Sequence, residues 1–388
     1  MKLLLSAKQR GSTNVLAPVA KELLSRGHQV SLYATGNETE AAGFNGLDYK
    51  HGAVGLDDFT RLVRDNKVVV VGLSGYGTPD SQFLKAANAE GIPTVAVQDQ
   101  NSNYVGRLGT NPADLPNILA VMSDDCIETA RRELGGEMGN EAAKRCRTVG
   151  WPAFDHYAAL RESFTEVKRR ELLGKLGLNP EKPVYFHATQ NGHPLSDYSL
   201  SAIRSEVVRD WEALSAKLEK LVKDKGAYFD YEMRVTETVF QAASDLGLRL
   251  VVKPHPGEKY AINFTEDLAK RHGFFYVPAE ACNTQQLMLA SYSVTAGRST
   301  CLTEATLLNR NTGAMLPDEL GKIWGTTGSP AISLDAIPVA YEWDHVIGIL
   351  AMVTSHNTAA QMLAENRKKF SVDGNASKRL ADLIEGLK

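Results

Sequence analysis

Two motifs decide the fold of this chain: Leu248-Arg-Leu-Val-Val-Lys-Pro-His-Pro-Gly-Glu258 and, further on, Thr295-Ala-Gly-Arg-Ser-Thr-Cys-Leu-Thr-Glu-Ala305. In the first motif, residues 250–252 form a short apolar run that is typical of a buried strand. The prolines on either side of His255 end that strand and stiffen the following turn, because proline fixes its own backbone angle and lacks an N–H donor. His255 is therefore predicted to lie at a strand end, in a rigid position.

The second motif predicts a strand, a tight turn and the start of a helix. Residues 291–295 form the strand, Gly297 permits the turn, and Ser299 and Thr300 open a helix that extends to about Leu308. Free N–H groups and two hydroxyls at a helix start are typical of an anion site, although an ordinary N-cap needs the same residues. The strand-end histidine and this helix start together predict a site for a diphosphate.

Both motifs resemble those of one enzyme superfamily. Lys253–Pro256 (Lys-Pro-His-Pro) and Ser299–Ala305 (Ser-Thr-x-x-x-Glu-Ala) are similar to motifs of the GT-B glycosyltransferases, most of all the bacterial polysaccharide and teichoic-acid branches. These enzymes are related to the UDP-N-acetylglucosamine 2-epimerases. The resemblance implies an α/β chain with two Rossmann-like βα domains that face each other across a cleft. It also implies that His255, Ser299 and Thr300 contact donor phosphates and that Glu304 binds a ribose.

Two further segments extend the resemblance and divide the chain. Gly150–Asp155 is similar to the segment at which GT-B chains cross between domains, and Asp373-Gly-Asn-Ala376 is similar to the start of their tail helix. The length of 388 residues also favours two domains. We expect an N-terminal acceptor domain, a linker, a C-terminal nucleotide-donor domain, and a helix that packs back on the first domain. The expected boundaries are 1–152, 153–182, 183–370 and 371–388.

The N-terminal segment predicts a βα unit with a site loop. Lys2–Leu5 reads as a strand, Ser6–Thr13 as a loop, and a helix follows from about Asn14. In a parallel sheet, ligands bind at the carboxyl ends of the strands. Lys8 and Arg10 are therefore candidates for contact with a phosphate or an acidic acceptor, and a solvated basic loop is the alternative. Gly11 would let the backbone approach a ligand closely.

Asp99 is the candidate general base of this half. Near-continuous apolar runs at Lys67–Leu73 and Ile92–Val97 predict central parallel strands, and Asp99 follows the second run. A carboxylate there can take a proton from an acceptor hydroxyl, whereas an Asx turn is the structural alternative. Residues 104–117 are expected to form a long loop that acts as an acceptor lid or is simply mobile.

The remaining candidates belong to the second half. Val184–Ala188 predicts the first strand there, and Thr189 and Gln190 follow it as candidates for binding the phosphate or the base of the donor. Lys253, Gly297 and Arg298 complete the predicted substrate-binding set because they lie within the two motifs.

Composition narrows the class of protein. The net charge of −3 gives no nucleic-acid footprint, and the four cysteines lack zinc-ligand spacing. The N-terminal apolar run is too short for a signal peptide, and no run reaches the length of a membrane span. We expect a cytoplasmic protein, with peripheral attachment to the membrane and homodimer formation left open.

The sequence favours a metal-independent, inverting glycosyltransferase in cell-surface glycan synthesis. The donor would be a nucleotide-activated sugar of the UDP or CMP/CDP type, the acceptor a glycan or a lipid-linked glycan, and no other cofactor is expected. A 2-epimerase is the first alternative, but where the epimerases carry two carboxylates this chain has Leu73 or Ser74, and Gln98. Asp99 lies one residue out of register with the second. A glycerophosphotransferase using CDP-glycerol and a non-catalytic sugar-nucleotide binder also remain open.

Overall fold

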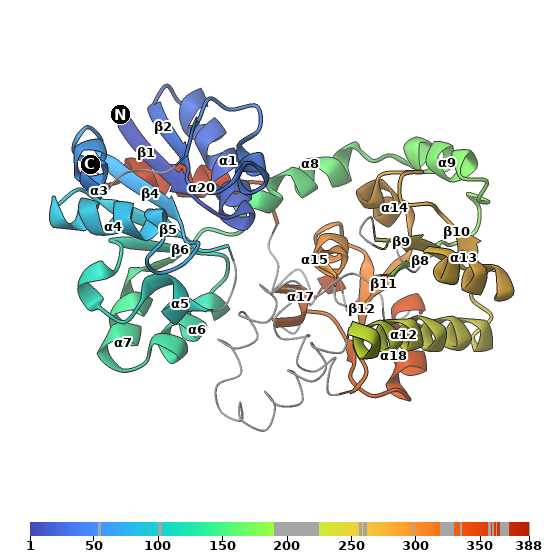
Figure 1. Cartoon of the computed structure of the whole chain (residues 1–388). Helices are drawn as coiled ribbons and strands as arrows, with labels where there is room; N and C mark the ends of the chain where they lie inside the picture. Colours follow the sequence, from blue (N-terminus) through green and yellow to red (C-terminus); the bar gives the residue numbers. More distant parts are fainter. Residues whose placement is uncertain are drawn as a thin grey trace. The chain divides into compact units, whose positions relative to one another are not determined.

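The chain folds into two compact α/β units, which Figure 1 shows in a computed structural model. The first unit comprises residues 1–158 and 371–388, and the second comprises residues 159–370. The structure describes residues 1–52, 56–99, 103–189, 225–255, 258, 262–297, 299–318, 330–333, 336–355, 358, 361, 363–364 and 372–387. Helix α8 (Asp155–Ser163) carries the chain from the first unit into the second.

The first unit is built on a seven-stranded sheet in which every pairing is parallel. In spatial order its strands are β3 (Lys50–His51), β2 (Gln29–Ala34), β1 (Lys2–Ala7), β4 (Val68–Gly72), β5 (Thr94–Val97), β6 (Ile118–Val121) and β7 (Cys146–Thr148). All residues of β4 are buried, as the apolar run predicted. The strand order reverses between β1 and β4, which is where ligands bind in such sheets.

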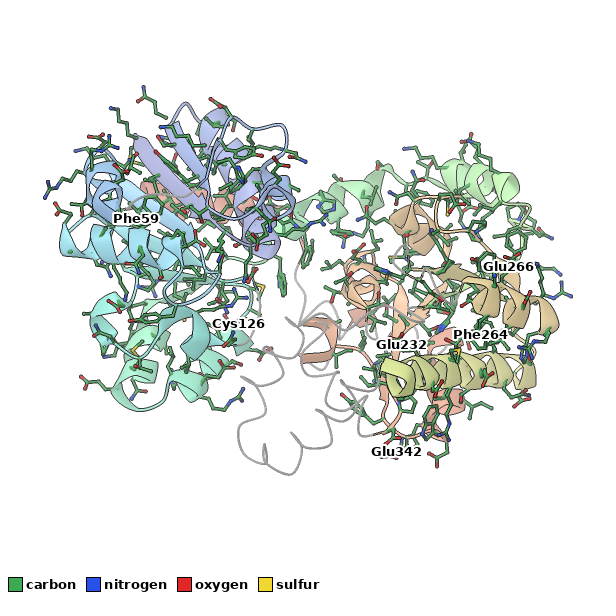
Figure 2. The ribbon with its side chains drawn as sticks, in the orientation of Figure 1. Phe59, Cys126, Glu232, Phe264, Glu266 and Glu342 are labelled. Atoms are coloured by element: carbon green, nitrogen blue, oxygen red, sulfur yellow. The ribbon has the colours of Figure 1, made fainter. Side chains whose placement is uncertain are left out.

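The helices of the first unit include one that is formed by the C-terminal residues of the chain. They are α1 (Arg10–Ser25), α2 (Glu38–Ala41), α3 (Leu56–Arg64), α4 (Pro79–Ala89), α5 (Tyr104–Leu108), α6 (Asp125–Leu134), α7 (Gly136–Arg145) and α20 (Ala376–Glu385), with 3-10 turns η1 (Ala42–Phe44), η2 (Pro112–Asp114) and η3 (Pro152–Phe154). Phe59 of α3, which is labelled in Figure 2, meets the ring of Phe83 of α4 edge to face, with centroids 4.7 Å apart.

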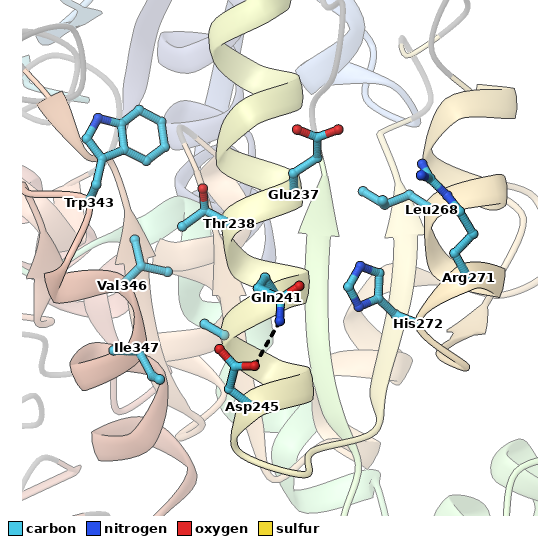
Figure 3. A pocket seen from close by; sticks show the side chains of 11 residues that line it. Glu237, Thr238, Gln241, Asp245, Leu268, Arg271, His272, Trp343, Val346 and Ile347 are labelled. Carbon is cyan, nitrogen blue, oxygen red and sulfur yellow. Dashed lines mark hydrogen bonds between the residues drawn. The ribbon is translucent and has the colours of Figure 1, made fainter.

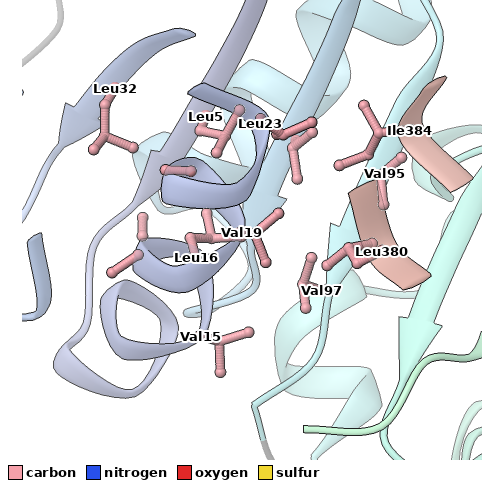
Figure 4. Close-up of a cluster of buried hydrophobic side chains, with 14 of the residues drawn as sticks. Leu5, Val15, Leu16, Val19, Leu23, Leu32, Val95, Val97, Leu380 and Ile384 are labelled. Atoms are coloured by element: carbon pink, nitrogen blue, oxygen red, sulfur yellow. The ribbon is translucent and has the colours of Figure 1, made fainter. Parts of the chain in front are cut away.

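The tail helix α20 is part of the core of the first unit. Leu380 and Ile384 belong to the buried cluster that contains Val19 of α1 and Val95 of β5 (Figure 4). Asp155 caps this helix, because its two carboxylate oxygens accept hydrogen bonds from the N–H groups of residues 376 and 377 at 2.9 and 2.7 Å. The two motifs at Gly150–Asp155 and Asp373–Ala376 thus meet at one helix start, although they are far apart in the sequence.

The second unit is built on a six-stranded parallel sheet with the same reversal of strand order. In spatial order its strands are β10 (Phe275–Tyr276), β9 (Leu250–Pro254), β8 (Tyr185–Thr189), β11 (Ser293–Ala296), β12 (Asn311–Met315) and β13 (Val339–Ala340). Its helices are α9 (Glu166–Lys175), α12 (Lys225–Asp245), α13 (Ile262–Arg271), α14 (Thr284–Ala290), α15 (Thr300–Leu307), α17 (Pro330–Ser333) and α18 (His345–Thr354). The reversal lies between β8 and β11.

Three elements differ from the sequence-based prediction. Helix α1 begins at Arg10 rather than near Asn14, since Ser12 and Thr13 bond back to the carbonyls of residues 9 and 10 instead of forming a loop. Residues 104–117 were predicted to be a loop, but they contain α5 and η2, and the side chains of Tyr104 and Arg107 are buried. Strand β9 extends through Pro254, whereas the sequence predicted that this proline ends the strand before it.

Among the helices that the structure describes, none has both the length and the apolar composition needed to cross a bilayer.

Candidate functional site

The candidate site of the second unit lies at the carboxyl ends of β9, β8 and β11. Ala188 of β8 pairs with Ala296 of β11, so Thr189 and Gly297 follow side by side at the reversal of strand order. On the other side of β8, the N–H group of His255 donates to the Thr189 carbonyl oxygen at 3.1 Å. The two motifs therefore flank the same strand end, as the parallel topology requires.

The turn that carries His255 is held by a buried carboxylate. Glu258 is fully buried and its Oε2 accepts hydrogen bonds from Thr189 Oγ1 at 2.8 Å and from the His255 N–H at 3.2 Å. Its Oε1 accepts from Thr265 Oγ1 of α13 at 2.7 Å. Glu258 was quoted in the sequence motif without a role, and only its position as the one acidic residue of that motif distinguished it.

The second motif forms a capped helix start. Ser299 is the N-cap of α15, and its Oγ accepts a hydrogen bond from the N–H of Cys301 at 3.2 Å. Thr300 is exposed at the first position of the helix. Glu304 lies one turn further on, where its Oε2 accepts from Gln285 Nε2 at 3.4 Å. The predicted phosphate and ribose contacts of these residues remain predictions.

Gly297 has no steric requirement of its own. Its backbone is outside the left-handed region, and a Cβ built on it would meet, among the described residues, only the Met315 carbonyl oxygen at 3.6 Å. That separation is an ordinary van der Waals contact. A Cβ at this position is therefore compatible with the described residues around it, and these residues do not explain the glycine.

Lys253 is directed into the protein. Its side chain is buried, and its Nζ donates to the carbonyl oxygens of Pro278 and Ala279 beyond β10. Burial lowers the pKa of this amino group. The lysine thereby ties β9 to the segment after β10. Gln190 and Arg298, the other candidates of this unit, lie outside the described residues.

A buried histidine that the sequence reasoning missed lies just below the strand ends. His187 of β8 is 2% exposed, and its Nδ1 lies 2.9 Å from Thr295 Oγ1 of the neighbouring strand β11. Burial lowers the pKa of His187 to about 4, so its ring is neutral at pH 7. A histidine inside an apolar strand gives no sequence signal that separates a structural role from a functional one.

In the first unit, Asp99 is part of a buried ion pair. Its Oδ1 lies against the Nη1 of Arg107, and their side chains are only 5% and 2% exposed. The same guanidinium donates to the Leu73 carbonyl oxygen at the end of β4. Arg107 was not foreseen because it belongs to the segment predicted as a loop. One oxygen of the proposed base is thus engaged within the protein, and its catalytic role remains a prediction.

The space beside Gly11 is filled by Asp99. A Cβ added at Gly11 would overlap Asp99 Oδ2, so the glycine lets the first turn of α1 approach this carboxylate. The sequence had suggested that Gly11 makes room for a ligand. Arg10, next to it, is exposed in the first turn of α1, and Lys8 is partly buried before the helix. Contact of either basic residue with a substrate remains a prediction.

We expect Gly11→Ala to lower the free energy of unfolding by about 1–3 kcal/mol, the usual cost of overpacking a site that cannot relax. Asp99 cannot easily withdraw because Arg107 holds its other oxygen. Chemical denaturation measures the change. Gly174→Ala is the matched control, since Gly174 is exposed in α9 with nothing near a built Cβ; it should gain about 0.5–1 kcal/mol from helix propensity. Equal stabilities for the two variants would show that Asp99 moves freely.

A second carboxyl group lies buried at the strand-order reversal of the first sheet. Asp80 of α4 is 1% exposed and its Oδ1 accepts hydrogen bonds from Ser6 Oγ at 2.8 Å and from Thr35 Oγ1 at 3.4 Å. Burial raises the pKa of Asp80 to about 6, although the hydroxyls of Ser74 and Ser6 oppose this rise. The sequence prediction passed over Asp80 because an acidic residue in the first turn of a helix is commonplace.

The structure also contains a surface pocket of about 530 Å³ in the second unit (Figure 3). It lies between α12, α13 and α18 and is lined by side chains that include Gln241, His272 and Trp343. Of the predicted site residues that the structure describes, none lines it. In the part of the chain that the structure describes, no three His, Cys, Asp or Glu side chains gather so as to hold a metal ion.

Comparisons with known proteins find a likeness at the level of structure. No protein-family model and no curated protein matches the sequence. The UDP-GlcNAc 2-epimerase of Neisseria meningitidis, solved bound to UDP-GlcNAc, matches with a TM-score of 0.61 and 14% identity over 100% of both chains. The MurG of Acinetobacter baumannii matches with a TM-score of 0.61 and 13% identity over 99% of both chains. The UDP-GlcNAc 2-epimerase of Methanocaldococcus jannaschii has a TM-score of 0.57 and 14% identity over 100% of both chains.

At identities this low, the structural likeness shows the fold and nothing further. The two Rossmann-like parallel sheets and the full-length likeness to MurG and the epimerases confirm the predicted fold class: the chain has the GT-B fold.

Proposed function

We propose that this chain is a nucleotide-sugar-dependent glycosyltransferase that acts in cell-surface glycan synthesis. The observation that supports this most directly is the meeting of the two motifs at the end of β8, where the His255 turn and the start of α15 flank one strand end. In the proposal this place in the second unit binds the diphosphate of a UDP-type or CDP-type donor, or the single phosphate of a CMP-type donor. The first unit binds the acceptor, a glycan or a lipid-linked glycan.

The unexplained glycine at 297 supports a ligand at this place. Glycine without a positive φ and without a close neighbour often marks a place where a ligand approaches the backbone closely. A phosphate at the start of α15 would be such a group, because the N–H groups and the dipole of a helix start favour an anion. The proposal therefore assigns the space beside Gly297 to the donor phosphate.

The proposed reaction is an inverting displacement that needs no metal ion. An acceptor hydroxyl attacks the anomeric carbon, the bond to the nucleotide phosphate breaks, and the leaving group carries away the negative charge. His255 and the start of α15 would stabilise that charge as it develops. Asp99 would accept the hydroxyl proton. Since Asp99 is paired with Arg107, it would need its second oxygen for this task.

The second candidate is a UDP-N-acetylglucosamine 2-epimerase. The fold likeness to two such enzymes favours it as much as the likeness to MurG favours a transferase. Two positions speak against it. Where the epimerases carry their first carboxylate this chain has Leu73 or Ser74, and where they carry the second it has Gln98. Both Leu73 and Gln98 are buried at strand ends. Neither side chain can take up or release a proton at neutral pH, so the proton transfers of an epimerisation would need other groups.

Two experiments test the proposal. A thermal-shift screen with UDP, CDP, GDP and CMP should identify one stabilising nucleotide, since a ligand at 100 times its Kd adds about 2.7 kcal/mol of stability. Incubation with UDP-N-acetylglucosamine alone then separates the candidates, because only an epimerase releases N-acetylmannosamine or 2-acetamidoglucal products. A chain that no nucleotide stabilises would contradict both candidates.

We expect Gly297→Ala to weaken nucleotide binding by about tenfold or more while the free energy of unfolding stays unchanged. The added methyl group fits the protein but would overpack a bound phosphate by about 1–3 kcal/mol. Isothermal titration with the nucleotide found in the screen gives the affinity. Gly348→Ala, on the exposed side of α18 with nothing near a built Cβ, is the control. Unchanged affinity in Gly297→Ala would remove the phosphate from this turn.

A further inference from the structure

The Glu258 carboxylate joins three elements of the second unit at the candidate site. Oε2 accepts from the last residue of β8, Thr189, and from the N–H of His255, while Oε1 accepts from Thr265 in the first half of α13. The N–H of Glu258 also donates to the His255 carbonyl oxygen at 2.9 Å. The turn after β9 is therefore closed on itself and bound to both neighbouring elements.

Burial of this carboxylate is unfavourable in free energy unless it is compensated. Removing an ionised group from water costs several kcal/mol unless hydrogen bonds compensate for the lost solvation. Here the two hydroxyls and the backbone N–H supply that compensation. An apolar residue could fill the same volume without these hydrogen bonds, so the presence of Glu258 points to a requirement for fixed placement of the turn.

Glu258 itself does not suit direct contact with a phosphate. An ionised carboxylate only accepts hydrogen bonds, and it would repel a second anion. Its effect on a ligand must therefore pass through the groups that it holds. Among the described residues, those at the strand ends are the end of β8 and the backbone of His255, whose N–H is shared between Glu258 Oε2 at 3.2 Å and the Thr189 carbonyl oxygen at 3.1 Å.

We propose that Glu258 is a positioning residue of the nucleotide site: it fixes the His255 turn against the end of β8, so that the imidazole is already placed when the donor phosphates bind. This inference rests on the proposed function, because it assigns the positioned turn to a nucleotide. A structural role alone would lower stability without changing the affinity of the folded protein. A positioning role changes the affinity of the folded protein as well.

The two oxygens of Glu258 allow a matched comparison. Thr265→Val removes the partner of Oε1 on α13 and leaves the bonds of Oε2 to Thr189 and His255 in place. Glu258→Ala removes both sets. In Glu258→Gln the amide oxygen can replace Oε2, and the amide N–H₂ can donate to the Thr265 hydroxyl, which is able to accept.

The test is titration of each folded variant with the nucleotide, among UDP, CDP, GDP and CMP, that binds the wild-type chain. We expect the Kd of Glu258→Ala to rise about tenfold or more, that of Glu258→Gln to return close to the wild-type value, and that of Thr265→Val to stay within about twofold. Thermal unfolding should show lower stability for both Glu258→Ala and Thr265→Val. If Glu258→Ala does not fold, Glu258→Asp replaces it, because its carboxylate is one methylene too short to bridge Thr189 and Thr265.

The outcomes distinguish a failure of the positioning role from a failure of the proposed function. A folded Glu258→Ala or Glu258→Asp variant that binds nucleotide as tightly as the wild type overturns the positioning role and leaves the proposed function intact. Equal losses of affinity in Thr265→Val and Glu258→Ala also overturn it, because they would show a general loosening of the unit. A wild-type chain that binds no nucleotide removes the proposed function and this inference with it.

Discussion

His255→Ala should lose about 100-fold or more of kcat/KM and fold normally. The loss corresponds to one hydrogen-bond donor that stabilises charge on a leaving group, for which about 100-fold to 1000-fold is usual. The backbone of residue 255 should stay in place without the imidazole, because its N–H bonds to Thr189 and Glu258 do not involve the side chain. Since the stabilised charge develops only during the reaction, turnover should fall more than nucleotide affinity.

The measurement uses the nucleotide sugar that carries the nucleotide found in the screen, with steady-state kinetics and circular dichroism on the same samples. His255→Gln should keep part of the activity, because its amide N–H₂ can still donate. His345→Ala, which removes an exposed histidine at the start of α18 in the same unit, is the control. A folded His255→Ala protein with near-normal turnover would take the central residue out of the proposed mechanism.

Asp80→Asn should make the chain more stable at pH 8 by up to about 3 kcal/mol and leave its stability unchanged near pH 3.5. Burial raises the pKa of Asp80 from 3.8 to about 6 in the folded chain, and each pKa unit corresponds to about 1.4 kcal/mol. Because the folded-state pKa is the higher one, the contribution of Asp80 to stability is complete below about pH 4. It is lost as the pH rises through 6. Asparagine behaves like the protonated acid, so its contribution to stability does not fall as the pH rises.

Urea denaturation at several pH values from about 3.5 to 8 measures this difference. The asparagine oxygen can still accept the hydrogen bond of Ser6, so the comparison isolates the charge. Asp65→Asn removes an exposed carboxylate of the same unit and serves as the control for the loss of one surface charge. If Asp80→Asn were less stable than the wild type at every pH, the ionised carboxylate would be more favourable in place than its burial indicates.

The sequence predicted the fold well where apolar runs and turn residues agree. The runs that became β4 and β5, and the start of α15 at Ser299, were located to within about two residues, because a buried strand or a capped helix has a local signature. The segment after residue 103 lacked such a signature. Its glycines and polar residues indicated a loop, whereas Tyr104 and Arg107 become buried through contacts with distant parts of the unit.

For the candidate site, the sequence named residues at strand ends and at a helix start, but it gave none of the contacts that they make. Gly11 was predicted to let the backbone approach a ligand, and the structure shows that Asp99 lies beside it. Thr189 was placed at a strand end, but its bond to Glu258 joins residues 69 positions apart. Asp99→Asn consequently needs a stability measurement beside its activity, since leaving Arg107 buried without its partner can cost about 3–5 kcal/mol.

The position of α20 constrains the order in which the chain can acquire its structure during synthesis. Leu380, Ala381 and Ile384 complete the core of the first unit, and Arg26 bonds to Asp382 and Glu385 of the same helix. A ribosome that has made residues 1–158 must still make the whole second unit before these residues emerge. At about 5–20 residues per second this delay is on the order of 10–40 s. The nascent first unit must therefore leave the apolar side chains that α20 later covers exposed throughout that time, while the second unit, contiguous in sequence, can fold first.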